Sequence, residues 1–200
     1  YVPYDIGNLS SLATLNLGGN FLTGLEDEIE DLTSLVLFYI HGTGNLSSLP
    51  ESICDGVGND MTSLGNLVSN VNHNITNFPT CLANLTTLYA LWCDACISMT
   101  TLPANLGTLP TLRTFELQST GVPAAVIDTF ISDVHANRAT NFCTNASINV
   151  TLELDGNGTL STASRDKIEG CGTETAATGI KTFAGSKCLT ILYDSPGACP

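Results

Sequence analysis

The chain has 200 residues, 43% of them hydrophobic, which is enough for one substantial core and favours a single domain. Nineteen Asp and Glu residues against six Lys and Arg give a formal net charge of -13, and no Lys or Arg precedes Arg113. This balance argues against binding to nucleic acid or an anionic membrane, because proteins hold phosphate groups through Lys and Arg.

Cysteines and glycosylation sequons together favour a secretory route. The chain has eight cysteines and no signal peptide, and its longest strongly apolar run, residues 35–40, is too short to span a bilayer. Seven Asn-x-Ser/Thr sequons lie at Asn8, Asn45, Asn74, Asn84, Asn145, Asn149 and Asn157. We therefore expect a mature or trimmed extracellular protein, secreted or cell-surface, that carries covalent N-glycans.

One frame of apolar positions recurs along the first 122 residues. It begins as "LSSLATLNLGGNFL" at 9–22, and its later copies lie at 32–45, 61–74, 85–98 and 109–122. The starts at 9, 32, 61, 85 and 109 are 23, 29, 24 and 24 residues apart, and the longest step contains the turn-forming "CDGVG" at 54–58. Such a period predicts stacked coils, each with a short strand and a polar residue turned inward to hydrogen-bond neighbouring coils.

The second halves of the repeats identify a family. "VPYDIGNL" at 2–9, "FPTCLANL" at 78–85 and "LPANLGTL" at 102–109 resemble the I-P-x-x-L-G-N-L segment of plant-type extracellular leucine-rich repeats, although Glu26 replaces the Pro of one copy. The resemblance covers residues 2 to about 126. It implies an α/β solenoid with one curved parallel sheet, without catalytic activity, that binds a protein, peptide or glycan on its concave face.

Beyond residue 126 the spacing lengthens. Strand-like segments at 114–121, 151–158 and 188–195 are 37 residues apart, with helix candidates at 124–136 and 161–169 between them. We predict two longer, helix-backed coils over residues 127–200 that extend the sheet of the repeats at 1–126 and close its C-terminal end. A separate small α/β cap is the alternative.

The segment "LWCDAC" at 91–96 allows two interpretations. A Trp followed by Cys-x-x-Cys is typical of a thioredoxin-like dithiol oxidoreductase, but that site needs its first Cys at a helix N-terminus. The following "ISMTTLP" is poor in helix formers, and the repeat frame turns Cys93 and Cys96 inward. We favour a structural role, and the sequence leaves open whether the two are bonded.

The remaining cysteines are interpreted as staples. A bond between Cys54 and Cys81 fits their places in adjacent coils, and Cys143 to Cys171 with Cys188 to Cys199 is one of three pairings open to the other four. We expect no metal and no cofactor, because no second Cys-x-x-Cys and no paired His accompany the first motif.

Outward-pointing strand residues line up across the coils on the concave face. One row reads Asn16, Tyr39, Val68, Trp92, Glu116 and Glu153, and the next reads Gly18, His41, Asn70, Asp94, Gln118 and Asp155. The predicted ligand-binding residues are Tyr39, His41, Trp92, Asp94, Glu116, Gln118 and Glu153. Aromatic rings beside carboxylates suit a ligand with an apolar or sugar face and a basic part, whereas simple pairing between neighbouring strands is the structural alternative.

Two functions follow as the principal hypotheses. The first is a non-catalytic extracellular recognition module. The second is a structural glycoprotein whose copies stack head to tail into a filament. The chain begins at "YVPYDIG", inside a repeat unit, and an uncovered coil exposes a strand edge, so either an upstream segment is missing or a neighbouring subunit supplies the cover. An oxidoreductase acting through Cys93 and Cys96 is the third and least favoured.

Overall fold

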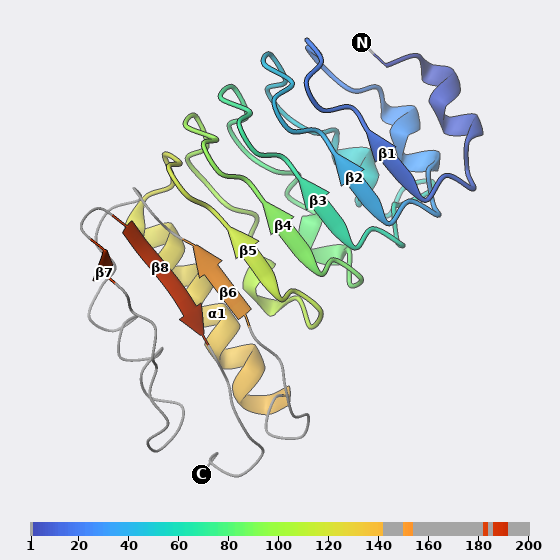
Figure 1. The fold of residues 1–200 in the computed structure, drawn as a ribbon. Helices are drawn as coiled ribbons and strands as arrows, with labels where there is room; N and C mark the ends of the chain where they lie inside the picture. The colour runs from blue at the N-terminus through green and yellow to red at the C-terminus, as the bar shows by residue number, and fades with distance from the viewer. Residues whose placement is uncertain (1, 142–149, 154–181, 184–185, 192–200) are drawn as a thin grey trace.

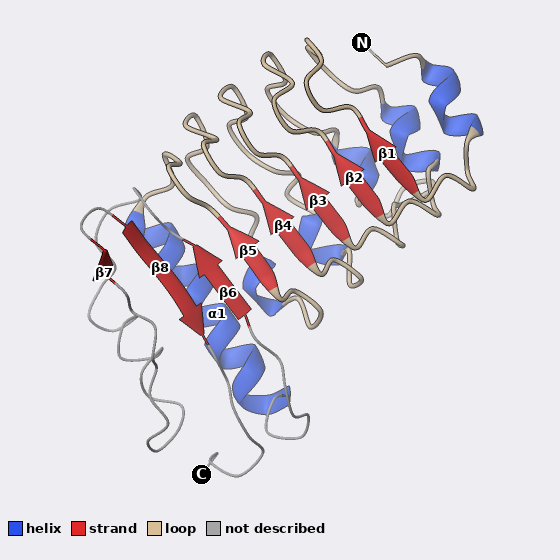
Figure 2. Cartoon of the chain, in the orientation of Figure 1, coloured by secondary structure: helices blue, strands red, loops and turns tan. Residues whose placement is uncertain are grey.

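The computed structural model describes residues 2–141, 150–153, 182–183 and 186–191. Five similar coils stack side by side and are followed by one long helix and three further strands (Figure 1). Each coil has a three-residue strand on one face and a short 3-10 helix on the other (Figure 2). The strands of the five coils are β1 (Thr14–Asn16), β2 (Leu37–Tyr39), β3 (Asn66–Val68), β4 (Ala90–Trp92) and β5 (Thr114–Glu116). The helices are η1 (Tyr4–Asn8), η2 (Asp27–Asp31), η3 (Glu51–Ile53), η4 (Leu82–Asn84) and η5 (Leu106–Thr108).

The strands pair in parallel and in chain order, so the predicted leucine-rich-repeat solenoid is confirmed. Glu26, which replaces the expected Pro, has φ -76° and ψ 158°, close to the values of Pro3 and Pro50 at the same place in their coils. An ordinary residue can adopt this extended conformation, so the departure from the motif leaves η2 intact.

The core lies between the sheet and the 3-10 helices. In the second coil Leu35, Phe38 and Ile40 are fully buried, and their counterparts in the later coils are buried in the same way. Hydroxyl groups also join the coils at the turns into β4 and β5. Thr111 Oγ1, for example, donates to the carbonyl oxygens of Thr86 and Leu88 at 2.6 and 2.9 Å. One coil therefore cannot bury its apolar face without its neighbours.

A buried polar side chain, Thr43, Asn72 or Thr120, stands inside the turn after the strand in the second, third and fifth coils. Asn72 is buried, and its Oδ1 accepts hydrogen bonds from the backbone N–H and the hydroxyl of Thr43 in the preceding coil. Its Nδ2 donates to the Ile40 carbonyl oxygen at 2.7 Å and to Ser69 Oγ at 3.0 Å. This one side chain therefore satisfies two backbone groups of the preceding coil and bonds a hydroxyl of its own coil.

The same turn requires a left-handed backbone at one residue of every coil. Gly19 and Gly42 occupy it in the first two coils, but Val71, Ala95 and Ser119 occupy it in the next three, at φ 61°, 55° and 49°. This conformation is unfavourable for any residue with a Cβ atom and most unfavourable for a β-branched one. Packing of the surrounding coils therefore holds the backbone of the last three turns in this unfavourable conformation.

Replacing Val71 with glycine should stabilise the protein by about 0.5–1 kcal/mol, because relief of the left-handed strain exceeds the added freedom of the unfolded chain. Little packing is lost, since half of the Val71 side chain is exposed. Urea unfolding measures the change, and the reciprocal Gly19→Val variant should shift stability in the opposite direction. A Val71→Gly variant less stable than the parent would contradict the strain assigned to this turn.

Helix α1 (Ala124–Asn141) closes the repeats and confirms the helix predicted at 124–136. Its buried residues Ile127, Phe130, Ile131 and Val134 follow the spacing of one helical face, and the Phe130 ring packs on Phe115 of β5 with centroids 4.7 Å apart. Strand β6 (Val150–Glu153) then pairs in parallel with β5. The first longer coil is therefore helix-backed and extends the sheet. Among the described residues, no helix is long and apolar enough to cross a membrane.

The last strand differs from the prediction. Strand β8 (Ser186–Ile191) pairs with β6 in antiparallel register, so residues 188–195 do not begin a second parallel coil. The reason is local: β7 (Thr182–Phe183) pairs antiparallel with β8, and this hairpin reverses the chain before β8 reaches the edge of β6. The helix candidate at 161–169 lies outside the described residues.

The predicted bond between Cys54 and Cys81 is present, with a distance of 5.4 Å between the Cα atoms. It joins the convex sides of the third and fourth coils, where Asn84 Nδ2 also donates to the Cys54 carbonyl oxygen at 3.0 Å. Cys188 lies in β8, and Cys143, Cys171 and Cys199 lie outside the described residues, so their pairing stays a prediction.

The inserted loop after η3 contains Asp55 and Asp60 and packs against Glu30 of the preceding coil. A Cβ atom on Gly58 would lie 2.9 Å from Glu30 Oε1, and Oε2 is a buried oxygen without a hydrogen-bond partner among the described residues. Burial first, then the charges of Asp31, Asp55, Asp27 and Asp60, raise the pKa of Glu30 above its ordinary value.

The sign of the resulting pH dependence follows from linkage. Because the folded protein binds the Glu30 proton more tightly than the unfolded chain does, stability rises as the pH falls through the raised pKa and levels off below the ordinary pKa. Glu30→Gln should therefore raise the melting temperature at neutral pH, and this gain should shrink on acidification. Glu28→Gln, an exposed change of the same charge on η2, is the control. A Glu30→Gln gain that is independent of pH would contradict the assignment.

Candidate functional site: the concave face

The open face of the sheet carries the predicted binding residues. Strand pairing aligns the last residue of each of the strands β1 to β6 in one row, namely Asn16, Tyr39, Val68, Trp92, Glu116 and Glu153. Neighbouring parallel strands lie about 4.8 Å apart, so each residue of the row can contact the next. The row predicted from the repeat frame is therefore the row that the sheet forms.

Tyr39 and His41 form the first half of this face. Their rings meet edge to face with centroids 6.4 Å apart, and the His41 ring lies directly over Gly18 of the first coil. A side chain at Gly18 would displace that ring. His41 is therefore fixed between two coils, half-buried rather than free in solvent.

Trp92, Asp94, Glu116 and Gln118 form the second half. The Asp94 backbone N–H donates to Asn70 Oδ1 at 2.9 Å, and Asp94 Oδ1 accepts from the Gln118 backbone N–H at 3.2 Å. These bonds form a ladder across three coils and fix the Asp94 carboxylate beside Trp92. Val68 separates Tyr39 from Trp92 in the row, so the two aromatic residues are not direct neighbours.

Glu153 continues the row as the Cα partner of Glu116. The sheet thus brings Trp92, Glu116 and Glu153 to consecutive positions, whereas Tyr39 and His41 make a separate pair two strands away.

Three further residues of this surface are absent from the predicted set. Val36 and Tyr89 immediately precede β2 and β4, with 43% and 53% of their surface exposed, and Asn70 bridges to Asp94. The signal was present in the repeat frame, because the residue before each strand also points outward. Val36 and Tyr89 lie outside the two predicted rows, whereas Asn70 lies in the second row but not among the predicted binding residues.

The cysteines of "LWCDAC" lie beneath this face. Cys93 and Cys96 are joined by a disulfide with Cα atoms 5.7 Å apart, and both are fully buried. Cys93 follows a strand and is followed by a turn, so it lacks the helix N-terminus that activates a thioredoxin-type thiol. In the third coil Ser69 and Asn72 hold the same two places through a hydrogen bond, which makes the disulfide its covalent counterpart.

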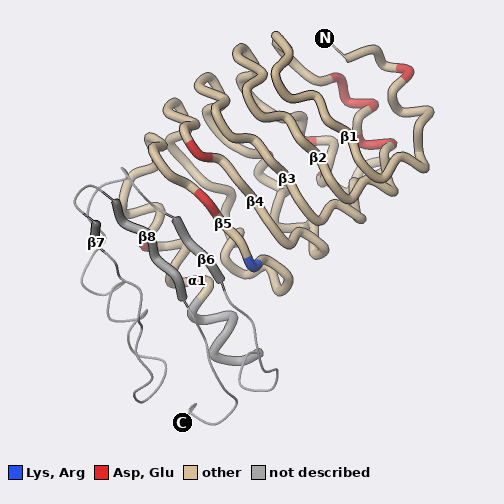
Figure 3. The backbone as a smooth tube through the Cα atoms, in the orientation of Figure 1, with Lys and Arg blue, Asp and Glu red and all other residues tan. Residues whose placement is uncertain are grey.

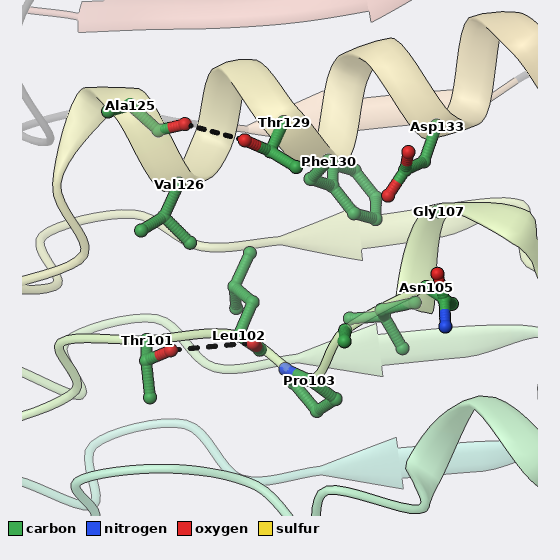
Figure 4. Close-up of a pocket in the computed structure, with 12 residues that line it drawn as sticks. Thr101, Leu102, Pro103, Asn105, Gly107, Ala125, Val126, Thr129, Phe130 and Asp133 are labelled. Atoms are coloured by element: carbon green, nitrogen blue, oxygen red, sulfur yellow. Dashed lines mark hydrogen bonds between the residues drawn. The ribbon is translucent and has the colours of Figure 1, made fainter.

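A groove of about 600 Å³ opens elsewhere, between η5 and the first half of α1 (Figure 4). Leu102 and Pro103 face Val126 and Phe130 across it, and Asp133 stands at one end. None of the predicted binding residues lines it. Among the described residues, no group of three or more His, Cys, Asp or Glu side chains is placed to hold a metal ion.

No protein-family model and no curated protein sequence matches the chain. Solved structures do match its fold. A leucine-rich-repeat protein of Leptospira interrogans aligns with 66% of this chain at 24% identity and a TM-score of 0.53. Toll in the Drosophila Toll–Spatzle complex aligns with 58% at 22% identity and 0.46, and the leucine-rich-repeat domain of the type III effector XopL aligns with 58% at 20% identity and 0.41.

The aligned part corresponds to 32%, 17% and 56% of those three chains, respectively, so this chain spans a third or less of the first two. At these identities the likeness concerns the fold. Together with the repeat frame and the parallel register, the likeness to the Leptospira protein shows that this chain folds as a leucine-rich-repeat solenoid.

Proposed function

We propose that this protein is a secreted, N-glycosylated recognition module that binds a protein, peptide or glycan partner on its concave face. The observation that carries the proposal is the row from Tyr39 to Glu116, in which aromatic, aliphatic and carboxylate side chains stand next to one another on an open sheet. Large aromatic residues are enriched at the centres of binding surfaces. The I-P-x-x-L-G-N-L-like segments support the plant-type class of the family.

The placement of the sequons supports the same proposal. Asn8, Asn45, Asn74 and Asn84 are all exposed, and none lies on strands β1 to β5. Asn8 and Asn84 lie on the 3-10 helices of the convex side, and Asn74 follows the β3 strand, with Nδ2 donating to the Gly44 carbonyl oxygen. Glycans at these four positions would leave the strand surface accessible. Asn145, Asn149 and Asn157 lie outside the described residues.

Trp92→Ala should weaken binding by at least tenfold, because the loss of a buried aromatic anchor typically costs about 2 kcal/mol or more. The experiment screens the glycosylated protein against panels of extracellular proteins and glycans. For each hit, the dissociation constant is then measured with the parent protein and with Trp92→Ala. Val57→Ala is the matched control, since Val57 is exposed on the inserted loop of the other side. Hits that bind both variants with equal affinity would refute the concave-face assignment.

Self-assembly is the second candidate. Leu12, Leu15 and Leu17 of the first coil are only partly buried, whereas their counterparts Leu35, Phe38 and Ile40 in the second coil are inaccessible. Phe21 of the first coil is 87% exposed. A second copy stacked on this end face would cover them. Sedimentation velocity over a range of concentrations tests the idea: oligomers that Phe21→Ser weakens would support it, and a monomer at the highest concentration would contradict it.

A further inference from the structure

We propose that the groove between η5 and α1 is a second binding site, for a small amphipathic amine. The apolar body of this ligand lies along the helix, and its ammonium group meets the Asp133 carboxylate. The inference goes beyond the proposed function, because the groove contains none of the predicted concave-face residues. The shape of the groove, its apolar walls and the polar groups that it offers together define the ligand.

Close contact at one end fixes the shape of the groove. η5 meets α1 at Gly107, where an added Cβ atom would lie 2.6 Å from the Phe130 carbonyl oxygen and 2.9 Å from Asp133 Cβ. Beyond this contact Leu102 and Val126 face each other across the groove, whose volume is about 600 Å³ (Figure 4). Sites for small molecules typically have volumes of about 300–1,000 Å³. The groove therefore has room for a small molecule.

One side of α1 forms a wall of the groove. Val126, Thr129, Phe130 and Asp133 are spaced i, i+3, i+4 and i+7, so they lie along the same side of the helix. At a rise of about 1.5 Å per residue, the distance along the helix axis from Val126 to Asp133 is about 10 Å. A ligand of about this length can place its apolar body at Val126 and a polar group at Asp133.

The polar groups of the lining favour a ligand that donates hydrogen bonds. The hydroxyl protons of the two threonines are already used, because Thr101 Oγ1 donates to the Leu102 carbonyl oxygen at 3.4 Å and Thr129 Oγ1 donates to the Ala125 carbonyl oxygen at 3.0 Å. The Asp133 carboxylate lies beside the Phe130 ring at the edge of the groove (Figure 4), without a hydrogen bond or ion pair to the residues that the structure describes. A carboxylate only accepts hydrogen bonds and is negatively charged, so a protonated amine suits it best.

Within residues 2–134 the chain places no cation of its own at Asp133. Arg113 is the one Lys or Arg in that range, and it does not line the groove. It lies just before β5 (Figure 3), where its Nη1 donates to two backbone carbonyl oxygens at 2.9 and 3.1 Å. Asn105, the remaining polar side chain of the lining, can both donate and accept hydrogen bonds, so it favours neither sign of charge. The positive charge must therefore come from the ligand.

The net charge of -13 also attracts cations at long range, so a test must separate this diffuse attraction from the local contact at Asp133. Three probes of similar size differ in their polar end: 4-phenylbutylamine, 4-phenylbutan-1-ol and 4-phenylbutanoate. Methylamine carries the charge without the apolar body.

Saturation-transfer NMR on the ligand detects binding to the glycosylated protein, and titration gives the dissociation constant. We expect a dissociation constant on the order of 1 mM for 4-phenylbutylamine, as is typical of so small a ligand. The alcohol should bind about fivefold more weakly, and the carboxylate and methylamine should not bind detectably.

Asp133→Asn should raise the dissociation constant of 4-phenylbutylamine about fivefold, the effect of losing one partly exposed charge pair, and leave that of the alcohol unchanged. Ala125→Trp, at an exposed position of the lining, should fill the groove and abolish the binding of both probes. Glu28→Gln removes the same charge from η2 and should change neither dissociation constant. Circular dichroism and thermal melting confirm that each variant folds.

Equal weakening by Asp133→Asn and Glu28→Gln would show diffuse attraction only and would overturn the proposal, as would amine binding that survives Ala125→Trp or the absence of amine binding to the parent protein. If Ala125→Trp does not fold, the comparison of the amine with the alcohol and the Asp133→Asn variant still decide. Trp92→Ala should bind the amine as the parent does. The groove and the concave face are thus tested independently of each other.

Discussion

Replacing both Cys54 and Cys81 with alanine lowers the free energy of unfolding by about 3 kcal/mol in urea titrations, the largest loss that we expect from any change outside the binding face. The bond closes a loop with a sequence separation of 27 residues and joins the convex sides of two coils whose strands β3 and β4 pair on the opposite face. Cutting it releases the third and fourth coils from each other in the unfolded chain. Cys54 is fully buried, so alanine avoids placing a polar group in the core.

The control for this prediction is chemical. A mild reductant that reaches the partly exposed Cys81 should cleave this bond in the native protein and cause the same loss of stability. It should leave the bond between Cys93 and Cys96 intact, because both of those cysteines are fully buried. The double alanine variant itself keeps that second bond. Unchanged stability of the double variant would mean that the third and fourth coils are held together without the staple.

Gly107→Ala should cost about 2 kcal/mol, because it forces α1 away from the repeats. A Cβ atom at Gly107 would lie 2.6 Å from the Phe130 carbonyl oxygen and 2.9 Å from both Asp133 Cβ and the Val134 nitrogen. Backbone atoms of a helix cannot move aside individually, so the helix must shift as a whole. Such a shift would loosen the contact between Phe130 and Phe115.

Gly24→Ala is the matched control, since no atom lies within 4 Å of its added Cβ and its φ is not positive. It should change stability by less than about 1 kcal/mol, in the stabilising direction. Differential scanning calorimetry of both variants measures the difference. Equal melting temperatures for Gly107→Ala and the parent would contradict the close packing of η5 on α1.

The repeat frame was sufficient to predict the sheet and the face. Each coil buries residues at fixed offsets from its first leucine, so the position of Leu85 also fixes which way Trp92 and Cys93 point. The bond between Cys54 and Cys81 could be predicted for the same reason. The repeat frame places the two cysteines in adjacent coils, and adjacent coils stack at one fixed distance.

Other features depend on contacts that no local pattern encodes. The antiparallel course of β8 is decided by its hairpin with β7, whereas the 37-residue spacing indicated another coil. Cys93 and Cys96 flank a turn in which Ala95 has a left-handed backbone, a conformation that its residue type does not predict. The role of Gly107 is also visible only once α1 is packed against it.

The structure sharpens the functional question raised by "LWCDAC". Its cysteines are bonded and buried, while Trp92 and Asp94 between and before them belong to the concave face. The disulfide therefore supports the turn that carries Asp94, and the outward residues carry the proposed recognition.

Hydrogen–deuterium exchange with and without a partner obtained from the binding screen is the most direct test of recognition through the concave face. The account predicts added protection in peptides that cover residues 37–41, 66–70, 90–94 and 114–118, and unchanged exchange in η2, η3 and η4 on the convex side. Protection confined to the convex helices or to the inserted loop at 54–60 would contradict it.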